Sequence, residues 1–578
     1  MTGPAAPKDP EKARPFFYIL KDKDIFGERQ KDGTGIQFIY ESDGRLINSA
    51  QITGNVTDKE ELTLLETVEG FGRLVHSIGV SVETDRPEET AEFVFQMYGK
   101  KDLYGGGTNL TTSLKCDGME HRIYLSDYRW TEDDHVPGQI KILFAAPERM
   151  GKVSVRLFLN DGYEAPPEEE DLVIDMHSEE YCGMISRSLL QLGNPYRIRK
   201  AIEKSKAGKE VTLAYIGGSI TQGAGAIPIH TECYAYKSFQ LFQNRFSTQN
   251  NVRFIKAGVG GTPSELGMIR FDRDVLREEE RPDIVVIEFA VNDEGDETKG
   301  VCYESLVRKV LKLPWKPAVV LLFSVFANDW NLQERLRPVG DLYDLPMVSI
   351  LNAVTPQFSL KCGEGRILSK NQFFYDIFHP NNIGHTIMAD CLQYLFECCD
   401  AAEPARVGTF VEGMTEEQIL SEKLFGPAVI GADFERIFLL DKKKRYVGAK
   451  IRTGSFTSTD IELQSVEMDG SLTQTPEFPY NWMYDGSRLQ MPGFEMEITC
   501  KSLFLIFKDS GEMDVGKANV FVNDVYCMTA DPHKNNWLHC NAVLLFWETE
   551  SRSHKVRIAV TEEDRNKKFT ILGFGYTI

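Results

Sequence analysis

The stretch VTLAYIGGSITQGAGA (211–226) is the clearest indication of the fold in the middle of this chain. Its apolar start predicts a buried strand, and the glycines after it let the backbone turn tightly into a segment with helical character. Amphipathic segments then alternate with three more apolar runs, PDIVVIEFAV (282–291), PAVVLLFSVF (317–326) and LPMVSI (345–350). Near-continuous apolar strands separated by helices are typical of a parallel sheet that helices cover on both faces. We therefore predict an α/β fold for this region.

The regions on either side of it contain short strands broken by turn signals. Examples are AEFVFQMYG (91–99) before the α/β region and EMEITCKSLFLIF (495–507) after it, and this pattern predicts β-sandwiches. Proline and acidic residues cluster in EAPPEEEDL (164–172), which is a candidate exposed connector. With the usual size of a domain, we predict three: a β-rich, sandwich-like domain with its linker over 1–190, the α/β domain over 191–404, and a second sandwich-like domain over 405–578.

The composition excludes several classes of protein. The chain has 42% apolar and 26% charged residues, as ordinary folded proteins do, and no apolar run long enough to cross a bilayer. Its formal net charge of −21 disfavours nucleic acid and anionic membranes as partners, because both attract Lys and Arg. A neutral or cationic partner fits better.

Two features predict a cytoplasmic protein. The first residues, MTGPAAPKDPEKARPFF (1–17), carry charges and prolines where an export signal has an apolar stretch. The eleven cysteines, which include the neighbours Cys398 and Cys399, do not have the pattern of a disulfide framework in a chain this large. Reduced thiols in the cytoplasm explain them best.

The first segment with a chemical signal is the turn that contains Ser219. A serine here stands at the carboxyl end of a strand, where open α/β sheets bind ligands, and the following helix directs its free N–H groups toward negative charge. Glycine-rich turns of this kind also cradle phosphates, and many have no chemical role. The segment is not a phosphate-binding P-loop, which ends in GK[ST], nor a GxSxG elbow, because Ile220 and Thr221 follow the serine.

Two more strands end in residues that can stabilise an oxyanion. FIKAGVGGTPSELG (254–267) brings glycines whose backbone can approach a bound anion, and the alternative is a plain loop between strand and helix. The run 282–293 delivers Asn292 and Asp293 to the same edge of the sheet. The amide of Asn292 can donate to a developing oxyanion, but both residues are also common in turns and helix caps.

The fourth segment is YDIFHPNNIGHTIMADCLQYLF (375–396), in which Asp376 stands three residues before His379. This spacing lets the carboxylate approach one ring nitrogen of the histidine while the other faces a serine, as a catalytic triad requires. His385, near the start of the last predicted helix of the α/β region, fits a surface or packed histidine better than a catalytic one.

Together, GGSIT, AGVGGT, AVND and DIFHP resemble, in order and spacing, the four sequence blocks of the SGNH/GDSL hydrolase family. The resemblance covers about residues 205–400 and implies a flavodoxin-like SGNH domain with a central parallel sheet. It implies a nucleophile and its acid–base partners at Ser219, Asp376 and His379. It also implies an oxyanion hole formed by the N–H of Ser219, by Gly261 (or, as the competing placement, Gly260) and by Asn292. Two positions depart from the common pattern: Gly218 replaces the aspartate of GDS, and Ala290 replaces the glycine of GxND.

The implied chemistry is acyl transfer through a covalent acyl-enzyme, which needs no organic cofactor. We also expect no metal, because the sequence contains no HExxH and no paired CxxC, and His533, His539 and Cys540 are too loosely arranged to specify a site.

The flanking β regions resemble the accessory modules of multi-domain bacterial carbohydrate acetylesterases, so we expect an acetylated oligosaccharide as the partner. A homo-oligomer is compatible with the sequence. Four aromatic residues could stack on sugars, although burial explains most such residues: Trp330, Tyr343, Trp482 and Trp537. The alternatives are a lipid or thioester acylhydrolase of the same family and, in another class, an inactive carbohydrate-binding scaffold.

Overall fold

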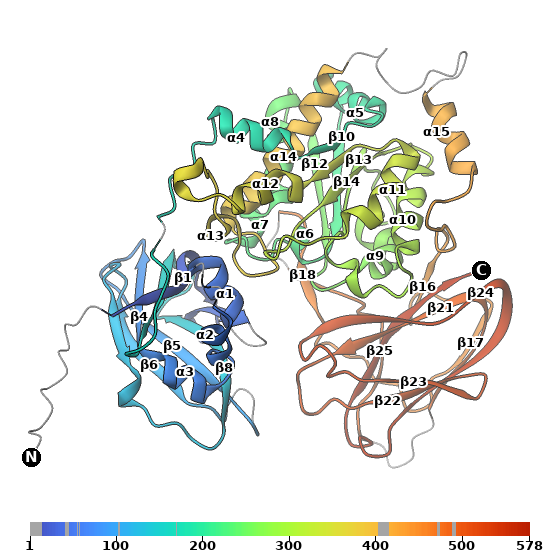
Figure 1. The fold of residues 1–578 in the computed structure, drawn as a ribbon. Helices are drawn as coiled ribbons and strands as arrows, with labels where there is room; N and C mark the ends of the chain where they lie inside the picture. Colours follow the sequence, from blue (N-terminus) through green and yellow to red (C-terminus); the bar gives the residue numbers. More distant parts are fainter. Residues whose placement is uncertain are drawn as a thin grey trace, which may run out of the picture. The chain divides into compact units, whose positions relative to one another are not determined.

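The computed structural model describes the chain except for residues 1–13, 41–44, 55, 57, 102–104, 169, 403–415, 471–473 and 488–492. Contacts divide the chain into two compact units, which we call unit 1 (residues 1–175, 225–228 and 356–384) and unit 2 (residues 176–224, 229–355 and 385–578). Figure 1 labels their elements along the chain. The predicted three-domain division stays a prediction, and the expected boundary at 404/405 lies outside the described residues, as does most of the start considered for an export signal.

Unit 1 contains two antiparallel sheets that share one hydrophobic core. The first has the order β1 (Phe16–Phe26), β9 (Met150–Leu159), β4 (Val75–Thr84), β7 (His121–Tyr124). The second has the order β2 (Glu28–Arg29), β3 (Gly35–Tyr40), β8 (Asp134–Phe144), β5 (Thr90–Gly99), β6 (Asn109–Lys115). Alternate residues of β9 (Val153, Val155 and Leu157) are fully buried, as the two-residue period of a strand requires.

Helices and turns complete unit 1. They are α1 (Arg45–Gly54), α2 (Lys59–Leu64), α3 (Val68–Leu74), η1 (Leu125–Asp127), η4 (Cys362–Glu364) and α13 (Lys370–Phe373). The first three were not predicted, because we interpreted this region from its strand patterns alone. Helix α13 belongs to the segment that leads to Asp376, and it contacts α1. The unit therefore combines the amino-terminal sheets with the chain around Asp376 and His379.

The central sheet of unit 2 contains the five predicted parallel strands. In spatial order they are β12 (Val252–Gly258), β11 (Val211–Gly217), β13 (Ile284–Glu288), β14 (Ala318–Phe323) and β15 (Met347–Ser349), and β10 (Leu189–Gln191) adds to β15 in the antiparallel direction. Numbered along the chain, the parallel strands have the order 2-1-3-4-5, which occurs in doubly wound α/β proteins. Gly217 lies in register with Gly258 and with Glu288, so the loops after these three strands leave the sheet at the same edge.

Helices cover both faces of this sheet (Figure 1). Ala214 and Ile216 of β11 join the core under α9 and α10, whereas the hydroxyl of Tyr215 bonds Ser238 of α8 on the opposite face. This explains why the strand is apolar at every position. The helices and turns assigned around the sheet are α4 (Glu179–Ser186), α5 (Tyr196–Lys206), α6 (Ser219–Gln222), α7 (Ile229–Glu232), α8 (Tyr234–Phe246), α9 (Ser264–Phe271), η2 (Asp272–Leu276), η3 (Asp293–Gly295), α10 (Val301–Leu311), α11 (Gln333–Tyr343), α12 (Ile350–Phe358), α14 (Asn382–Ala401) and α15 (Glu416–Phe425).

The carboxyl-terminal part of unit 2 is an antiparallel β structure. Its main sheet has the order β16 (Phe438–Leu440), β25 (Phe569–Thr577), β21 (Phe494–Asp509), β24 (His539–Val560), β22 (Ala518–Val522), β23 (Val525–Ala530), with β17 (Ala449–Arg452) on β21 and β20 (Trp482–Tyr484) on β25. A separate hairpin pairs β18 (Ser465–Glu467) with β19 (Gln474–Pro476).

This sheet is buried on both faces along part of β21. Leu503, Leu505 and Phe507 point into its own core, whereas Phe504 and Ile506 join the core of the α/β sheet. Alternation along a strand sends neighbours to opposite faces, so the apolar run 503–507 is explained by two cores rather than one. The α/β part and the carboxyl-terminal sheet are thus held together by one continuous hydrophobic cluster.

The structure confirms a mixed α/β protein with a parallel sheet and additional antiparallel sheets. All eleven cysteines are free thiols. Among the described residues, no helix combines the length and the apolar character needed to span a membrane.

Candidate active site

Ser219 begins the short helix α6 directly after β11. The two glycines before it are required by close packing. A Cβ on Gly217 would lie 2.5 Å from the carbonyl oxygen of Glu288, and a Cβ on Gly218 would overlap Oδ1 of Asn292 and lie 2.6 Å from its Nδ2. The glycine that departs from the GDS pattern is therefore the residue that this packing allows. It also means that the amide of Asn292 lies beside the backbone that leads into Ser219.

Asn292 and Asp293 have different environments. Asn292 is at the edge of the sheet, and its buried Oδ1 has no hydrogen-bond partner among the described residues. Asp293 is fully buried, and its carboxyl accepts from the N–H of Ser264 at 2.7 Å, which caps the start of α9. Burial raises the pKa of Asp293 to about 8. The helix-cap alternative considered from the sequence thus describes Asp293, whereas Asn292 remains available for the site.

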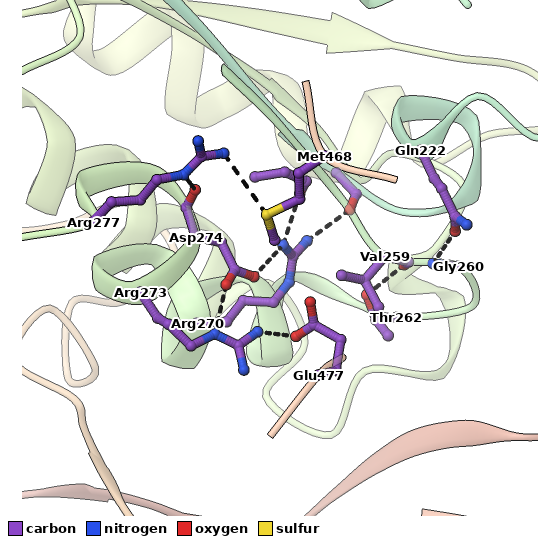
Figure 2. Close-up of polar contacts among 12 residues, drawn as sticks. Gln222, Val259, Gly260, Thr262, Arg270, Arg273, Asp274, Arg277, Met468 and Glu477 are labelled. Atoms are coloured by element: carbon purple, nitrogen blue, oxygen red, sulfur yellow. Dashed lines mark hydrogen bonds and ion pairs between the residues drawn. The ribbon is translucent and has the colours of Figure 1, made fainter. Parts of the chain in front are cut away.

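The loop after β12 runs beside Ser219. A Cβ on Gly260 would lie 3.8 Å from Cβ of Ser219, and the N–H of Gly260 donates to Oε1 of Gln222 at 2.8 Å (Figure 2). Gly261 has φ +70°, a left-handed conformation that favours glycine, and its N–H has no hydrogen-bond partner among the described residues. Of the two placements left open by the sequence, Gly261 therefore offers the N–H that a ligand could use.

A buried arginine that the sequence analysis did not identify joins the ends of two strands. Arg270 of α9 is completely buried and donates to the carbonyl oxygens of Gly217 at 2.8 Å and Ala257 at 2.7 Å. Asp274 accepts from the same guanidinium at 3.0 Å, as Figure 2 shows. Arg270 thus fixes the carboxyl ends of β11 and β12, from which the Ser219 and Gly261 loops emerge. Its only sequence signal is a charged residue in an otherwise apolar helix face.

Asp376 and His379 form a close pair in unit 1. Nδ1 of His379 lies 2.9 Å from both carboxylate oxygens of Asp376. Oδ1 of Asp376 also accepts the backbone N–H groups of Phe378 at 2.8 Å and of His379 at 2.9 Å. The three-residue spacing therefore closes a turn in which the carboxylate orients the imidazole. Ser219 belongs to unit 2, so the structure brings together the acid–base pair in one unit and Ser219, Gly261 and Asn292 in the other.

His385 is a packed histidine. It is fully buried, its Nδ1 accepts from the N–H of Tyr234 at 3.1 Å, and its Nε2 lies 3.1 Å from the carbonyl oxygen of Ala224. Both ring nitrogens are thus used by the backbone around the site, as expected for a residue that supports the fold.

Two of the four aromatic residues considered for sugar stacking are buried. Trp482 belongs to the core of the carboxyl-terminal sheet, and the hydroxyl of the buried Tyr343 donates to Glu304 at 2.7 Å. Trp330 is partly buried against Phe326. Trp537 is 44% exposed, and a Cβ on Gly261 would lie 2.8 Å from its ring. Trp537 is therefore the aromatic residue of this group that lies beside the candidate site.

Comparisons with known proteins found a matching family model and similar solved structures. Residues 215–387 match the GDSL-like Lipase/Acylhydrolase family model, which confirms the resemblance inferred from the four sequence blocks. Among solved structures, the chain is similar to a two-domain esterase (CEX) active on acetylated mannans. The form co-crystallized with mannopentaose has 24% identity and a TM-score of 0.53, and the form without it has 23% and 0.54. Each match covers 68% of this chain and 98% of the other. A comparison with the curated proteins finds no match.

Proposed function

We propose that this protein is a serine esterase that removes acetyl groups from carbohydrate, with Ser219 as the nucleophile. The observation that carries the proposal is that the structure assembles two groups of residues, which we call half-sites. One contains Ser219 at the start of a helix, with the amide of Asn292 packed on the preceding Gly218 and the Gly260–Gly261 loop next to the serine. The other contains a histidine oriented by a carboxylate. These are the groups that acyl transfer by a triad requires.

The chain passes directly from unit 2 to unit 1 between Ala224 and Gly225, and each of these two residues contacts one of the half-sites. In unit 2, the N–H of Ala224 donates to the carbonyl oxygen of Ser219 at 2.9 Å. The next residue, Gly225, packs within unit 1, where a Cβ on it would lie 3.1 Å from Cβ of His379. Only one peptide bond therefore separates a residue bonded to Ser219 from a residue packed on His379.

In the proposed reaction, Nε2 of His379 accepts the proton of the Ser219 hydroxyl while Oγ attacks the ester carbonyl carbon. Asp376 holds Nδ1 and stabilises the imidazolium. The oxyanion accepts hydrogen bonds from the N–H groups of Ser219 and Gly261 and from the amide of Asn292. The alcohol leaves with the proton from His379, and water then hydrolyses the acyl-enzyme to release acetate.

The choice of substrate rests on two observations. The chain shares its fold with an esterase active on acetylated mannans, and Trp537 presents an exposed ring beside Gly261. Indole rings provide apolar faces on which sugar rings can stack. An acetylated oligosaccharide is therefore the proposed partner, whereas the structure provides no specific observation in favour of a lipid or a thioester.

The nucleophile can be tested by covalent labelling. A fluorophosphonate probe should label the wild-type protein and the control Ser359→Ala, which changes an exposed serine of unit 1, but should not label Ser219→Ala. Labelling that survives in Ser219→Ala would place the nucleophile elsewhere. No labelling of the wild type would favour the non-catalytic scaffold.

The acyl group and the sugar need a second assay. The kcat/KM values for acetate, butyrate and octanoate esters of one alcohol should fall with chain length, because each methylene forced into a small pocket costs roughly 1–3 kcal/mol. Acetylated manno- and xylo-oligosaccharides should then be hydrolysed faster than an acetylated simple alcohol. A rate that rises with chain length, or that ignores the sugar, would favour the lipid or thioester acylhydrolase.

A further inference from the structure

We propose that Gln464, from the carboxyl-terminal β region, is a positioning residue for the oxyanion hole. Its Nε2 donates to the carbonyl oxygen of Gly260 at 3.1 Å, and its Oε1 accepts the N–H of Cys540 at 3.0 Å. Gln464 is 8% exposed. Because one partner is a carbonyl and the other an N–H, they fix which end of the amide faces Gly260. This inference rests on the proposed function, in which the N–H of Gly261 stabilises the oxyanion.

The contact with Gly260 controls the direction of the Gly261 N–H. The carbonyl of Gly260 and the N–H of Gly261 belong to one planar trans peptide, in which they point in opposite directions. A hydrogen bond that holds the carbonyl toward Gln464 therefore directs the N–H away from Gln464. Without such a hold, two consecutive glycines could rotate this peptide at little steric cost.

The neighbouring backbone groups of the loop are also held. Gln222 accepts the N–H of Gly260 at 2.8 Å, and Nε2 of His539 lies 3.1 Å from the carbonyl oxygen of Gly261. His539 is itself buried, and its Nδ1 lies 3.5 Å from the carboxylate of Asp509. Of the four backbone polar groups of Gly260 and Gly261, three thus have partners, and the fourth, the N–H of Gly261, has none among the described residues.

The carboxyl-terminal sheet can act in this way because it is anchored to the α/β part. Cys540, whose N–H fixes Gln464, belongs to the hydrophobic cluster that also contains Leu266 and Ile269 of α9. The Gly260 loop immediately precedes this helix. Hydrogen-bond donors stabilise a transition state most when they need no rearrangement during the reaction. By holding the Gly260 peptide in place, the attached β region would contribute to catalysis in addition to any contact with sugar.

The first test replaces Gln464 with an apolar residue of similar length. Gln464→Met should lower kcat by about 10- to 100-fold, less than the loss of a whole oxyanion donor, with KM within about 2-fold of wild type. The matched control is Arg277→Met, which removes hydrogen bonds between Arg277 and Asp469 of the same β region but leaves the Gly260 peptide untouched. This control should keep the wild-type kcat.

The second test gives a pH signature that a structural role would not produce. In Gln464→Glu, a protonated carboxyl can donate to Gly260 and accept from Cys540, whereas the ionised form places a negative oxygen against the Gly260 carbonyl. The ratio of the variant kcat to the wild-type kcat should therefore rise as the pH falls. Taking the ratio removes any pH dependence that the variant and the wild type share.

The outcomes separate this inference from the proposed function. A wild type that hydrolyses acetyl esters, with a Gln464→Met variant of equal kcat or a Gln464→Glu ratio independent of pH, would overturn the positioning role alone. An equal loss of kcat in Arg277→Met would overturn the positioning role as well, because the loss of any contact with the β region would then be enough to lower kcat. A wild type with no esterase activity would overturn both proposals.

Discussion

The side-chain amide of Asn292 occupies the space that a side chain at residue 218 would need, so Gly218 and Asn292 pack directly against each other. The two residues come from the loops after β11 and β13, which lie side by side in the sheet. This relationship links the glycine that departs from the GDS pattern to the residue proposed as an oxyanion donor. A change at either position should therefore act on the same proposed hydrogen bond, which runs from the Asn292 amide to the oxyanion.

Gly218→Ala should displace the Asn292 amide and reproduce the effect of Asn292→Ala. Each variant should lower kcat by about 10²–10³, with KM nearly unchanged, because the donor matters mainly in the transition state. The double mutant should be little worse than either single variant, since both remove one interaction. Steady-state kinetics of the three proteins measures this. Multiplicative losses, or a change in KM alone, would contradict it.

The proposed triad of Ser219, His379 and Asp376 should behave as a unit. Ser219→Ala and His379→Ala should each leave only residual activity, and the double mutant should be little slower. Asp376→Asn should lower kcat by about 10⁴, because its amide no longer holds the correct tautomer of His379. The control His135→Ala changes an exposed histidine of unit 1 and should keep full activity. More than about a tenth of wild-type activity in a triad variant would show that the residues are assigned wrongly.

Lys23 should stabilise the segment before Asp376. This buried lysine of β1 is 3% exposed, and its ammonium donates to the carbonyl oxygens of Asn371, at 3.3 Å, and Phe374. Lys23→Met should lower the free energy of unfolding by about 1–3 kcal/mol, because buried carbonyls lose a charged donor. Denaturant unfolding measures this, and Lys152→Met, at an exposed position of β9, is the control. Equal stability of both variants would contradict the role of Lys23.

Asp293 should make the protein less stable as the pH rises. Burial raises the pKa of Asp293 from 3.8 to about 8, so the folded state binds a proton that the unfolded state has already lost. This contribution to stability is present in full below about pH 4 and is lost as the pH rises to about 8. Asp293→Asn removes the titrating group and should flatten the fall in stability between these values. Burial also raises the pKa of Glu265 to about 7, so Glu265 should keep part of the fall in stability in this variant.

The test compares denaturant unfolding of Asp293→Asn and wild type at several pH values between 4 and 8. Parallel curves for the two proteins would show that Asp293 does not titrate in this range.

The features that depend on local spacing could be predicted from the residues alone. Continuous apolar runs such as 284–287 predicted strands buried on both faces, because only a covered parallel sheet removes every side chain from water. The three-residue step from Asp376 to His379 predicted their contact, because a single turn brings these side chains together. The four sequence blocks then predicted which residues could act together.

The features that join distant parts of the chain became visible in the folded structure. Gln464 reaches Gly260 across 204 residues, and Arg270 reaches Gly217 across 53. Nothing near these positions in the sequence indicates such partners. Tyr343 and Trp482 could have been exposed aromatics, yet both are buried. A hydrogen bond or a packed ring between segments forms only after the sheets are stacked, so its partners follow from how the sheets pack and not from local patterns.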